Sequence, residues 1–345
     1  MRAIGFEKTG SIEELKILNV SSLPSTTPPL HVRLKFLAGA LNHLDLWVIQ
    51  GLPKLKYNFP HIAGMDICAE VLDCPSGKWK VGSKVIVYPG ESSGLNEQGQ
   101  PMPENLCEDF RIRGETMPGV FVEELLIDEK YVFEMPLHLN EREAAALPLG
   151  YLTAWQMFAE KADLLRPTVE KDAPILIHAA GSGVSQALLE LCLSAGFQKI
   201  ALTSRSSEKL KFWSDRGVKV GDPKAILQQW GLKHFDVIFD HVGEAFFATN
   251  IRLLARNGRF VTCGATSGFN ATLDLRHLFF RQLQLLGSTM GSLLHFHQML
   301  EWVSRHKIQP QVSNTFQIED AKTAYQTLAE GQQNGKVILS GFCKL

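Results

Sequence analysis

The chain has 345 residues, which is enough for about two domains and for a core that needs no disulfide or metal to hold it. Hydrophobic residues make up 45% and charged residues 21%, and the formal net charge is −1. This is the composition of a soluble globular protein, and the balanced charge excludes a global basic field that would bind nucleic acid or an anionic membrane.

The cysteines and the N-terminus predict a reducing, cytoplasmic environment. No C-x-x-C pair is present, which argues against a disulfide framework, and no four cysteines have the spacing of a zinc site. The opening segment MRAIGFEKTG lacks the apolar stretch of a signal peptide, and no apolar run approaches the roughly 18 residues that span a bilayer. We therefore expect small buried thiols and no membrane partner. The six cysteines are Cys68, Cys74, Cys107, Cys192, Cys263 and Cys343.

Residues 1–140 carry short β-branched or apolar runs between glycine, proline and polar turns, a pattern typical of an irregular β region. The runs cover residues 31–38, 67–72, 84–88 and 120–127. Residues 90–119 are rich in Gly, Pro and polar side chains and predict an exposed lobe. A helix is expected after Asn140, which can cap it, because Glu143 follows three positions later.

From Pro174 the pattern changes to a regular alternation of strands and helices. Apolar residues recur at helical spacing from Val184 to Ala195, as expected of a helix that packs on a sheet. Strands separated by helix-length segments imply βαβ crossovers and a parallel sheet. The strands are predicted at 174–179, 199–204, 235–240, 258–263 and 283–288. From about residue 293 we expect a helix, then the segment IEDAKTAYQTLAEG, then a last strand in GKVILSG.

The loop AAGSGVSQA, residues 179–187, leaves the first of these strands and opens the helix. Gly181 and Gly183 permit a tight turn and a close approach of a pyrophosphate to backbone N–H groups at the helix N-terminus. The third glycine of the fingerprint is missing, because Gln186 stands in its place with Ala187 next. In this context the loop predicts dinucleotide binding, and the alternative is an ordinary glycine-rich turn.

The end of the second strand of this region bears on the choice of cofactor. NAD enzymes usually carry Asp or Glu here, which accepts hydrogen bonds from the ribose hydroxyls. This chain has neither at the strand end and offers Ser204, Arg205 and Lys209 instead. A carboxylate would repel a 2′-phosphate, whereas a guanidinium binds it through charge-assisted hydrogen bonds. We therefore predict NADP(H), with a merely solvated helix start as the alternative.

Seven stretches, in this order, carry a resemblance to a known family. They are GALNHLDLWVIQG (39–51), PHIAGMDICAEV (60–71), AAALPLGYLTAWQ (144–156), FDVIFDHVG (235–243), GRFVTCGATSG (258–268), LLGSTMGS (285–292) and GKVILS (335–340). The chain resembles the medium-chain dehydrogenase/reductase superfamily along nearly its full length, and its quinone-reductase-like and zinc-binding dehydrogenase branches in particular. The resemblance implies an α/β fold, with a GroES-like β domain (1–145 and 293–345) and a Rossmann-type, doubly wound parallel-sheet domain (146–292).

Members of this family that use zinc would carry a cysteine at Asn42, a histidine at Met65 and a third ligand near Leu149. None of these side chains supplies a thiolate or an imidazole, and Asp66 alone cannot hold the metal. Members with a structural zinc carry four cysteines in the lobe, of which this chain keeps Cys107. The other three positions hold Ser93, Asn96 and Gly99. We therefore expect no zinc, and a lobe that is held by other contacts.

Without zinc, the interconversion of simple alcohols and carbonyls lacks the Lewis acid that stabilises an alkoxide. Quinones and α,β-unsaturated carbonyls remain accessible, because their hydride adducts spread charge into a quinol anion or an enolate that hydrogen-bond donors can stabilise. We therefore predict an NADPH-dependent oxidoreductase that reduces a quinone or an enone. Two alternatives stay open, namely reduction of another activated carbonyl such as an aldehyde, and a cofactor-binding protein with little turnover.

The catalytic candidates are Asn42, Asp45 and Tyr57. Asn42 occupies the vacated ligand position and Asp45 flanks it, while Tyr57 is a substitute proton donor because Trp47 stands where many quinone reductases carry a tyrosine. Besides Gly181, Ser204, Arg205 and Lys209, the resemblance implies cofactor contacts by Thr153, Gly183, Val184, His241, Val242, Gly264, Ala265, Thr266, Ser288, Thr289, Met290 and Lys336. It places Lys336 on a cofactor phosphate. It also implies a homodimer, whose sheet continues across a two-fold axis through the strand at 283–288.

Overall fold

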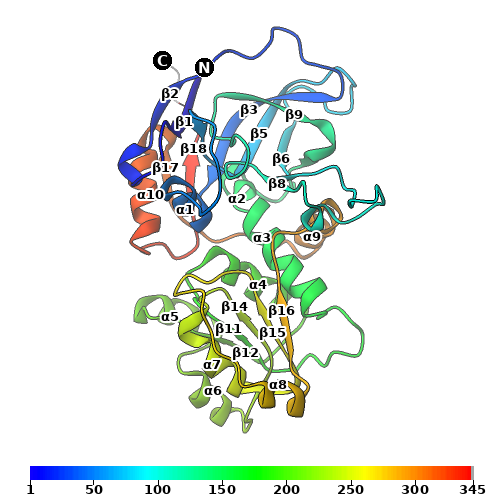
Figure 1. Cartoon of the computed structure of the whole chain (residues 1–345), viewed down its shortest axis with the longest axis vertical. Coiled ribbons are helices and arrows are strands. Elements are labelled where there is room, and N and C mark those ends of the chain that lie inside the picture. The colour runs from blue at the N-terminus through cyan, green and yellow to red at the C-terminus, as the bar shows by residue number, and fades with distance from the viewer. Residues whose placement is uncertain (343–345) are drawn as a thin grey trace. The chain divides into compact units, whose positions relative to one another are not determined.

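The computed structural model describes residues 1–342 and divides into two compact units (Figure 1). The first unit comprises residues 1–152 together with the chain from residue 291 onward, and the second comprises residues 153–290. Helix α3 (Pro148–Trp155) runs through the first boundary, and a π-helix (Gln156–Lys161) follows it. Within residues 1–342, no helix is long and apolar enough to cross a membrane.

The first unit is built on β-sheets. The largest sheet has seven strands, in the order β10-β6-β5-β3-β18-β17, and β9 pairs with β3 beside this path. Its strands are β3 (His31–Ala40), β5 (Asp66–Asp73), β6 (Lys84–Val87), β9 (Glu124–Asp128), β10 (Val132–Glu134), β17 (Val312–Gln317) and β18 (Lys336–Ser340). A second sheet contains β1 (Arg2–Phe6), β2 (Lys16–Asn19) and β4 (His61–Ile62), and a third contains β7 (Gly90–Glu91) and β8 (Arg111–Ile112).

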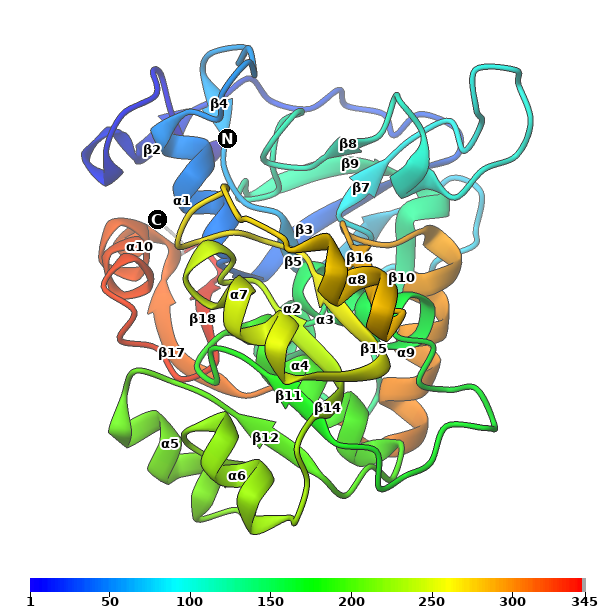
Figure 2. The ribbon, with the colours of Figure 1, turned by 60° about the horizontal axis from the view of Figure 1, so that its bottom comes forward.

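The centre of the large sheet follows from the sequence pattern. In β3 the apolar residues Val32, Leu34 and Phe36 are buried and alternate with partly or fully exposed polar residues, so one face of this strand enters the core. The last strand, β18, pairs antiparallel with β3 and brings the C-terminal segment into the middle of the sheet. Helix α10 (Ala321–Ala329) packs on β17 and β18 (Figure 2).

The other helices of the first unit range from single turns to the 14 residues of α9. Helix α2 (Glu141–Ala145) begins as predicted, because the Asn140 side chain accepts hydrogen bonds from the N–H groups of Arg142 and Glu143, and Glu143 accepts one from the Asn140 N–H. The remaining helices are α1 (His43–Gln50), α9 (Leu293–His306), and the 3₁₀ turns η1 (Ile12–Glu14), η2 (Glu104–Leu106), η3 (Glu129–Tyr131) and η5 (Ile318–Asp320).

The second unit is a six-stranded parallel sheet with flanking helices (Figure 1). Its strand order is β13-β12-β11-β14-β15-β16. When these six strands are numbered along the chain, this is the Rossmann order 3-2-1-4-5-6. The strands are β11 (Ile175–Ile177), β12 (Ile200–Leu202), β13 (Lys219–Val220), β14 (Phe235–Asp240), β15 (Leu254–Thr262) and β16 (Gln284–Gly287). The helices are α4 (Gly183–Ser194), α5 (Ser207–Ser214), α6 (Pro223–Gln229), α7 (Glu244–Leu253) and α8 (Leu275–Arg281).

The predicted α/β fold class, with a β domain and a doubly wound parallel sheet, is confirmed, and eight strands lie outside the predicted runs, namely β1, β2, β4, β7, β8, β10, β13 and β17. Strand β13 has two residues and leaves no periodic signal, and β17 (VSNTFQ) lacks clean apolar alternation. The run at 120–127 was expected as one strand, but the strand begins only at Glu124. The five described cysteines are free thiols, and Cys343 lies outside the described residues.

Candidate active site

Strand register brings three polar residues together at one end of the large sheet. Ala40, the last residue of β3, pairs with Asp66 at the start of β5 and with Ile338 of β18. Continuing the antiparallel register past Ala40 sets Lys336 opposite Asn42, two residues beyond the end of β3. We refer to Asn42, Asp66 and Lys336 as the lysine cluster.

The lysine cluster is closed by direct hydrogen bonds. Lys336 Nζ donates to Asn42 Oδ1 at 2.7 Å and to Asp66 Oδ2 at 3.0 Å. Asn42 Nδ2 donates to the same Asp66 oxygen at 2.9 Å, and the backbone N–H of Leu149 donates to Asp66 Oδ1 at 2.8 Å. All three side chains are buried, and the exposed fraction of Asp66 is 0%. The carboxylate is therefore held from three sides, as a buried charge requires.

In this structure the Lys336 ammonium lies in the lysine cluster, and its predicted contact with a cofactor phosphate stays a prediction. Its ammonium is bound to Asp66 and Asn42, because β18 pairs beside β3 and starts level with the end of that strand. The three positions at which the resemblance places zinc ligands hold an amide, a thioether and an alkyl side chain, and an ammonium now lies against the first of them. Within residues 1–342, no group of three His, Cys, Asp or Glu side chains could hold a metal ion. This donor set does not fit zinc, because a bound ammonium repels a cation and no thiolate or imidazole is offered.

Asp45 belongs to the same region as the lysine cluster. Its Oδ2 accepts a hydrogen bond from the Asn42 N–H at 2.7 Å at the start of α1, and its side chain is buried. Burial raises the pKa of Asp45 to about 7, and the nearby Asp66 carboxylate acts in the same direction. Asp45 is thus poised to gain or lose a proton near neutral pH.

The structure does not bring Tyr57 to Asn42 and Asp45. The Tyr57 ring packs edge-on against Phe6 and His61, with centroid distances of 6.3 and 5.2 Å. Its hydroxyl accepts a hydrogen bond from the Leu52 N–H at 3.3 Å, and burial raises its pKa. The Tyr57 side chain therefore packs against aromatic residues of β1 and β4 in this structure.

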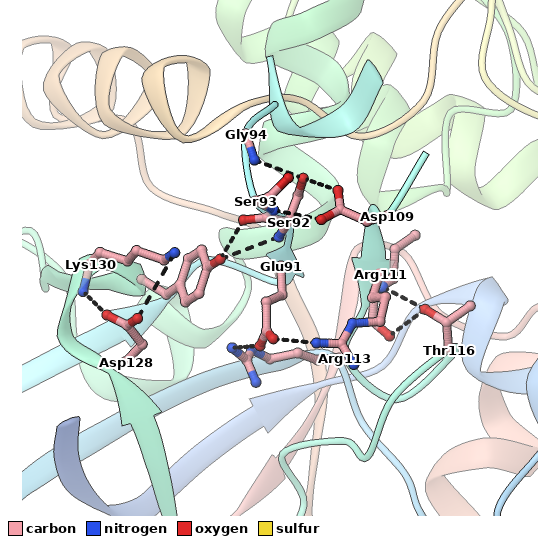
Figure 3. A network of polar contacts seen from close by, with 12 residues as sticks. Glu91, Ser92, Ser93, Gly94, Asp109, Arg111, Arg113, Thr116, Asp128 and Lys130 are labelled. Atoms are coloured by element: carbon pink, nitrogen blue, oxygen red, sulfur yellow. Dashed lines mark hydrogen bonds and ion pairs between the residues drawn. The ribbon is translucent and has the colours of Figure 1, made fainter. Parts of the chain in front are cut away.

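The lobe at residues 90–119 is held by carboxylate and amide contacts where cysteines would bind a structural zinc. The Asp109 carboxylate accepts hydrogen bonds from Ser92 Oγ at 2.6 Å and from the Ser93 N–H at 2.9 Å (Figure 3). Asn96 Oδ1 accepts from the N–H groups of Gln98 and Gln100. The hydrogen bonds from Ser92 and Ser93 lower the pKa of Asp109, which favours its charged form.

A cavity of about 750 Å³ is lined in part by residues of this lobe, and no sequence pattern predicted it. Glu91 forms ion pairs with Arg111 and Arg113 at its wall (Figure 3). The Arg113 guanidinium is buried against the Tyr131 ring, 5.6 Å from the centroid, and burial lowers its pKa. Its lining mixes both signs of charge, which favours a structural network of ion pairs over a site for one kind of ion.

In the second unit, the structure brings the predicted phosphate loop and Lys209 together. A Cβ at Gly181 would lie 2.8 Å from Lys209 Nζ and 2.7 Å from its Cδ, so the lysine side chain crosses the loop where only glycine leaves room. Helix α4 begins at Gly183, so its free N–H groups point to the same place. Burial lowers the pKa of Lys209, and the nearby Arg205 acts in the same direction.

The missing third glycine has a structural explanation. The Gln186 side chain is buried, and its Nε2 donates to the Ala180 carbonyl at 3.3 Å, which also accepts from Trp213 Nε1 at 3.2 Å. Ser185 Oγ donates to the His178 carbonyl at 2.6 Å and lies 2.9 Å from His241 Nε2. Side-chain hydrogen bonds of Gln186 and Ser185 therefore hold the loop, in place of the close packing that a third glycine would allow.

The other predicted cofactor residues of the second unit follow the carboxyl ends of its strands, except Thr153, which is buried on α3. Gly264 packs on His241, because a Cβ there would come within 3.2 Å of the His241 carbonyl. Ser288 is buried, and its hydroxyl makes no hydrogen bond to a described residue. In a Rossmann sheet this edge is the nucleotide site. The predicted cofactor residues at this edge are Gly181, Gly183 and Val184 after β11, Ser204 and Arg205 after β12, His241 and Val242 after β14, Gly264, Ala265 and Thr266 after β15, and Ser288, Thr289 and Met290 after β16.

Both units match known proteins. Residues 28–137 match the alcohol dehydrogenase GroES-like domain, and residues 215–339 match the zinc-binding dehydrogenase family. A crystal structure of an NAD-dependent alcohol dehydrogenase is 34% identical over 99% of this chain and 100% of that chain, with a TM-score of 0.88. The chain belongs to the medium-chain dehydrogenase/reductase superfamily. It is thus an oxidoreductase of that superfamily.

Three curated relatives have lower sequence identity to this chain. A crotonyl-CoA carboxylase/reductase of Cereibacter sphaeroides is 25% identical, over 96% of this chain and 84% of the relative. The quinone oxidoreductase-like protein 2 of Bos taurus is 24% identical, over 92% of this chain and 87% of the relative. A zinc-type alcohol dehydrogenase-like protein of Leptosphaeria maculans is 28% identical, over 93% of each chain. The family therefore includes members named for different acceptors, and the side chains of the site have to discriminate between them.

Proposed function

We propose that this protein is an NADP(H)-dependent reductase of quinones or α,β-unsaturated carbonyls that works without zinc. The observation that carries the proposal is the lysine cluster, in which an ammonium and an amide stand where zinc-using members of the family hold a metal. Hydrogen-bond donors can stabilise the reduced form of a quinone or enone, because reduction spreads negative charge over its conjugated system. The names of the crotonyl-CoA and quinone relatives agree with this class of acceptor.

The second unit offers the groups that would hold the cofactor. The N–H groups at the start of α4 and the Lys209 ammonium fit a pyrophosphate, and the exposed Arg205 fits a 2′-phosphate. The buried Ser288 hydroxyl, which has no partner among the described residues, would find one in the nicotinamide end of the ligand. When bound, NADPH supplies a hydride to the acceptor.

The first unit supplies charge and a proton. Lys336 and Asn42 are fixed by Asp66, so the cluster need not reorganise during the reaction. Asp45, with a pKa of about 7, holds a proton at neutral pH in part of the molecules and is the proposed internal source for the reduced acceptor. Tyr57 has no part in this scheme.

We also propose that the protein forms a homodimer through the second unit. Strand β16 lies at the edge of the parallel sheet and pairs there with β15 alone. Helix α8, which precedes it, exposes Leu275, Phe279 and Phe280, with exposed fractions of 63%, 59% and 64%. An open strand edge beside exposed aromatic side chains suits a second copy of the same surface across a two-fold axis.

The test is NADPH oxidation in the presence of three acceptors, namely an ortho-quinone, a conjugated alkenal and a saturated aldehyde. We expect turnover with the quinone or the alkenal and little with the saturated aldehyde. Preference for the saturated aldehyde would instead assign the protein to reduction of simple carbonyls. Tight NADPH binding without turnover of any of the three would contradict the reductase assignment and favour a cofactor-binding role.

A further inference from the structure

We infer that Lys336 contacts the acceptor and takes over the electrophilic role that zinc has in metal-using relatives. The inference rests on the proposed function and deepens it, because it assigns the group that receives the negative charge. It is an alternative to the expectation that Lys336 binds a cofactor phosphate. The argument starts from the hydrogen bonds of the ammonium.

A lysine ammonium has three N–H donors in tetrahedral arrangement. In Lys336 two of them are used, by Asn42 Oδ1 at 2.7 Å and Asp66 Oδ2 at 3.0 Å. The third makes no hydrogen bond to a described residue. A catalytic zinc has the same property, since its protein ligands leave one position open for the substrate.

The space beside this ammonium is free of a side chain. Gly150, in the first turn of α3, faces Lys336, and a Cβ added there would lie 4.0 Å from Nζ with no nearer neighbour. A larger residue at 150 would project toward the ammonium. The absence of a side chain at this position leaves room for an acceptor oxygen.

Asn42 and Asp66 are positioning residues in this scheme. Asn42 uses its carbonyl oxygen on Lys336 and its amide nitrogen on Asp66, so both ends of its side chain hold the cluster together. Asp66 balances the ammonium charge, and the Leu149 N–H ties Asp66 to α3. Because the cluster is buried, an oxyanion that meets the third N–H is screened little by water.

The chemistry balances for an enone. When bound, NADPH would supply a hydride, with its electron pair, to the β-carbon. The C=C electron pair moves to form a new double bond to the carbonyl carbon, and the C=O electron pair moves onto oxygen. That enolate oxygen accepts a hydrogen bond from the Lys336 ammonium. A proton from solvent or Asp45 then adds to the α-carbon, which leaves the saturated ketone and the oxidised cofactor.

The first experiment compares Lys336→Met with the wild type under steady-state conditions. We expect kcat to fall by about 10²-fold, the loss typical of removing one oxyanion donor, and the Kd for NADPH to stay unchanged. A higher Kd for NADPH with an unchanged kcat would mean that Lys336 binds the cofactor, and would overturn the inference. Lys322→Met is the matched control, because Lys322 lies on α10 in a surface ion pair with Glu13.

Lys336→Met leaves a buried carboxylate without its counter-charge and can fail to fold. The double variant Asp66→Asn/Lys336→Met removes both charges with little change in volume, so it can be assayed even if the single variant does not fold. The double variant is expected to fold, to bind NADPH and to show the same loss of kcat. A folded double variant with wild-type kcat would overturn the inference.

A second measurement does not depend on turnover. 4-Nitrophenol serves as the probe, because its phenolate is an oxyanion whose absorbance reports its ionisation. Wild-type protein is expected to lower the apparent pKa of the bound phenol, and Lys336→Met or the double variant to abolish that shift. No phenolate binding to the wild type, or equal binding to the variants, would overturn the inference. If the protein binds the phenolate through Lys336 but reduces no acceptor, the proposed function is contradicted and the role of Lys336 as an oxyanion-binding group stands.

Discussion

Lys336 Nζ and Asp66 Oδ2 lie 3.0 Å apart although 270 residues separate them in the chain. Their side chains are 6% and 0% exposed, so the ion pair is buried. Such a pair gains little free energy overall, because desolvation of the two charges offsets their attraction. Stability alone therefore does not account for its presence at a position where the resemblance places a zinc ligand.

Breaking the ion pair from one side is expected to destabilise the protein. Asp66→Ala leaves the Lys336 ammonium buried without its carboxylate and should lower the free energy of unfolding by about 3–5 kcal/mol. The neutral pair Asp66→Asn/Lys336→Met should restore most of that loss. Urea denaturation measures both. Equal stability of the single and the double variant would show that the two charges are not coupled.

The titration of Asp45 is expected to appear in the pH dependence of stability. Its folded pKa of about 7 lies above the ordinary value of 3.8, so the folded state holds a proton that the unfolded state has released between these pH values. The free energy of unfolding should therefore fall as pH rises from about 4 to 7, by up to about 1.4 kcal/mol per pH unit from this group. Asp45→Asn should flatten that slope. Urea denaturation at pH 5 and pH 7 checks it, and equal slopes in both proteins would contradict the assignment.

Arg205 is expected to set the preference for NADPH. The solved alcohol dehydrogenase that is 34% identical is named NAD-dependent, so a preference for NADPH has to come from this chain's own side chains. Arg205→Ala should raise the Kd for NADPH at least tenfold, since a charge-assisted hydrogen bond is lost, and leave the Kd for NADH unchanged. Arg216→Ala is the control, because Arg216 follows α5 at its other end, over the Phe212 ring. Equal effects on both cofactors would exclude recognition of the 2′-phosphate by Arg205.

The edge of the second unit is expected to mediate self-association. Phe280→Asp places a charge on the exposed face of α8, beside the strand edge, and should shift the protein from dimer to monomer. Sedimentation velocity over a range of concentrations measures the shift. Leu137→Asp, at an even more exposed apolar position of the first unit, should leave association unchanged. A wild-type protein that stays monomeric throughout would refute the homodimer.

The extent to which the sequence predicts this protein depends on how local each signal is. The phosphate loop and the cap at Asn140 are set by neighbouring residues, and both form as expected. The hydrogen bonds of Lys336 could not be predicted, because they depend on the pairing of β18 with β3, almost 300 residues away in the chain. The neighbours of Tyr57 could not be predicted either, because a loop residue has no periodic pattern that fixes its direction.

The cavity lined in part by the lobe also lay beyond prediction. Glu91 lies on β7 and Arg113 follows β8, and nothing in their local sequence indicates that Arg113 is buried. The sequence indicates that contacts other than four cysteines hold the lobe, but it does not identify Asp109 as the residue that makes them. Contacts between distant segments are a property of the tertiary fold, and a single sequence does not reveal them.

The central claim is that reduction proceeds without zinc, and the most direct test measures metal content and turnover on the same sample. Protein treated with a chelator and dialysed is assayed for zinc and for NADPH oxidation with an ortho-quinone and a conjugated alkenal, with NADH as the comparison. We predict undiminished turnover at substoichiometric zinc, with NADPH preferred over NADH. Turnover that disappears with the metal and returns when zinc is added would contradict the account.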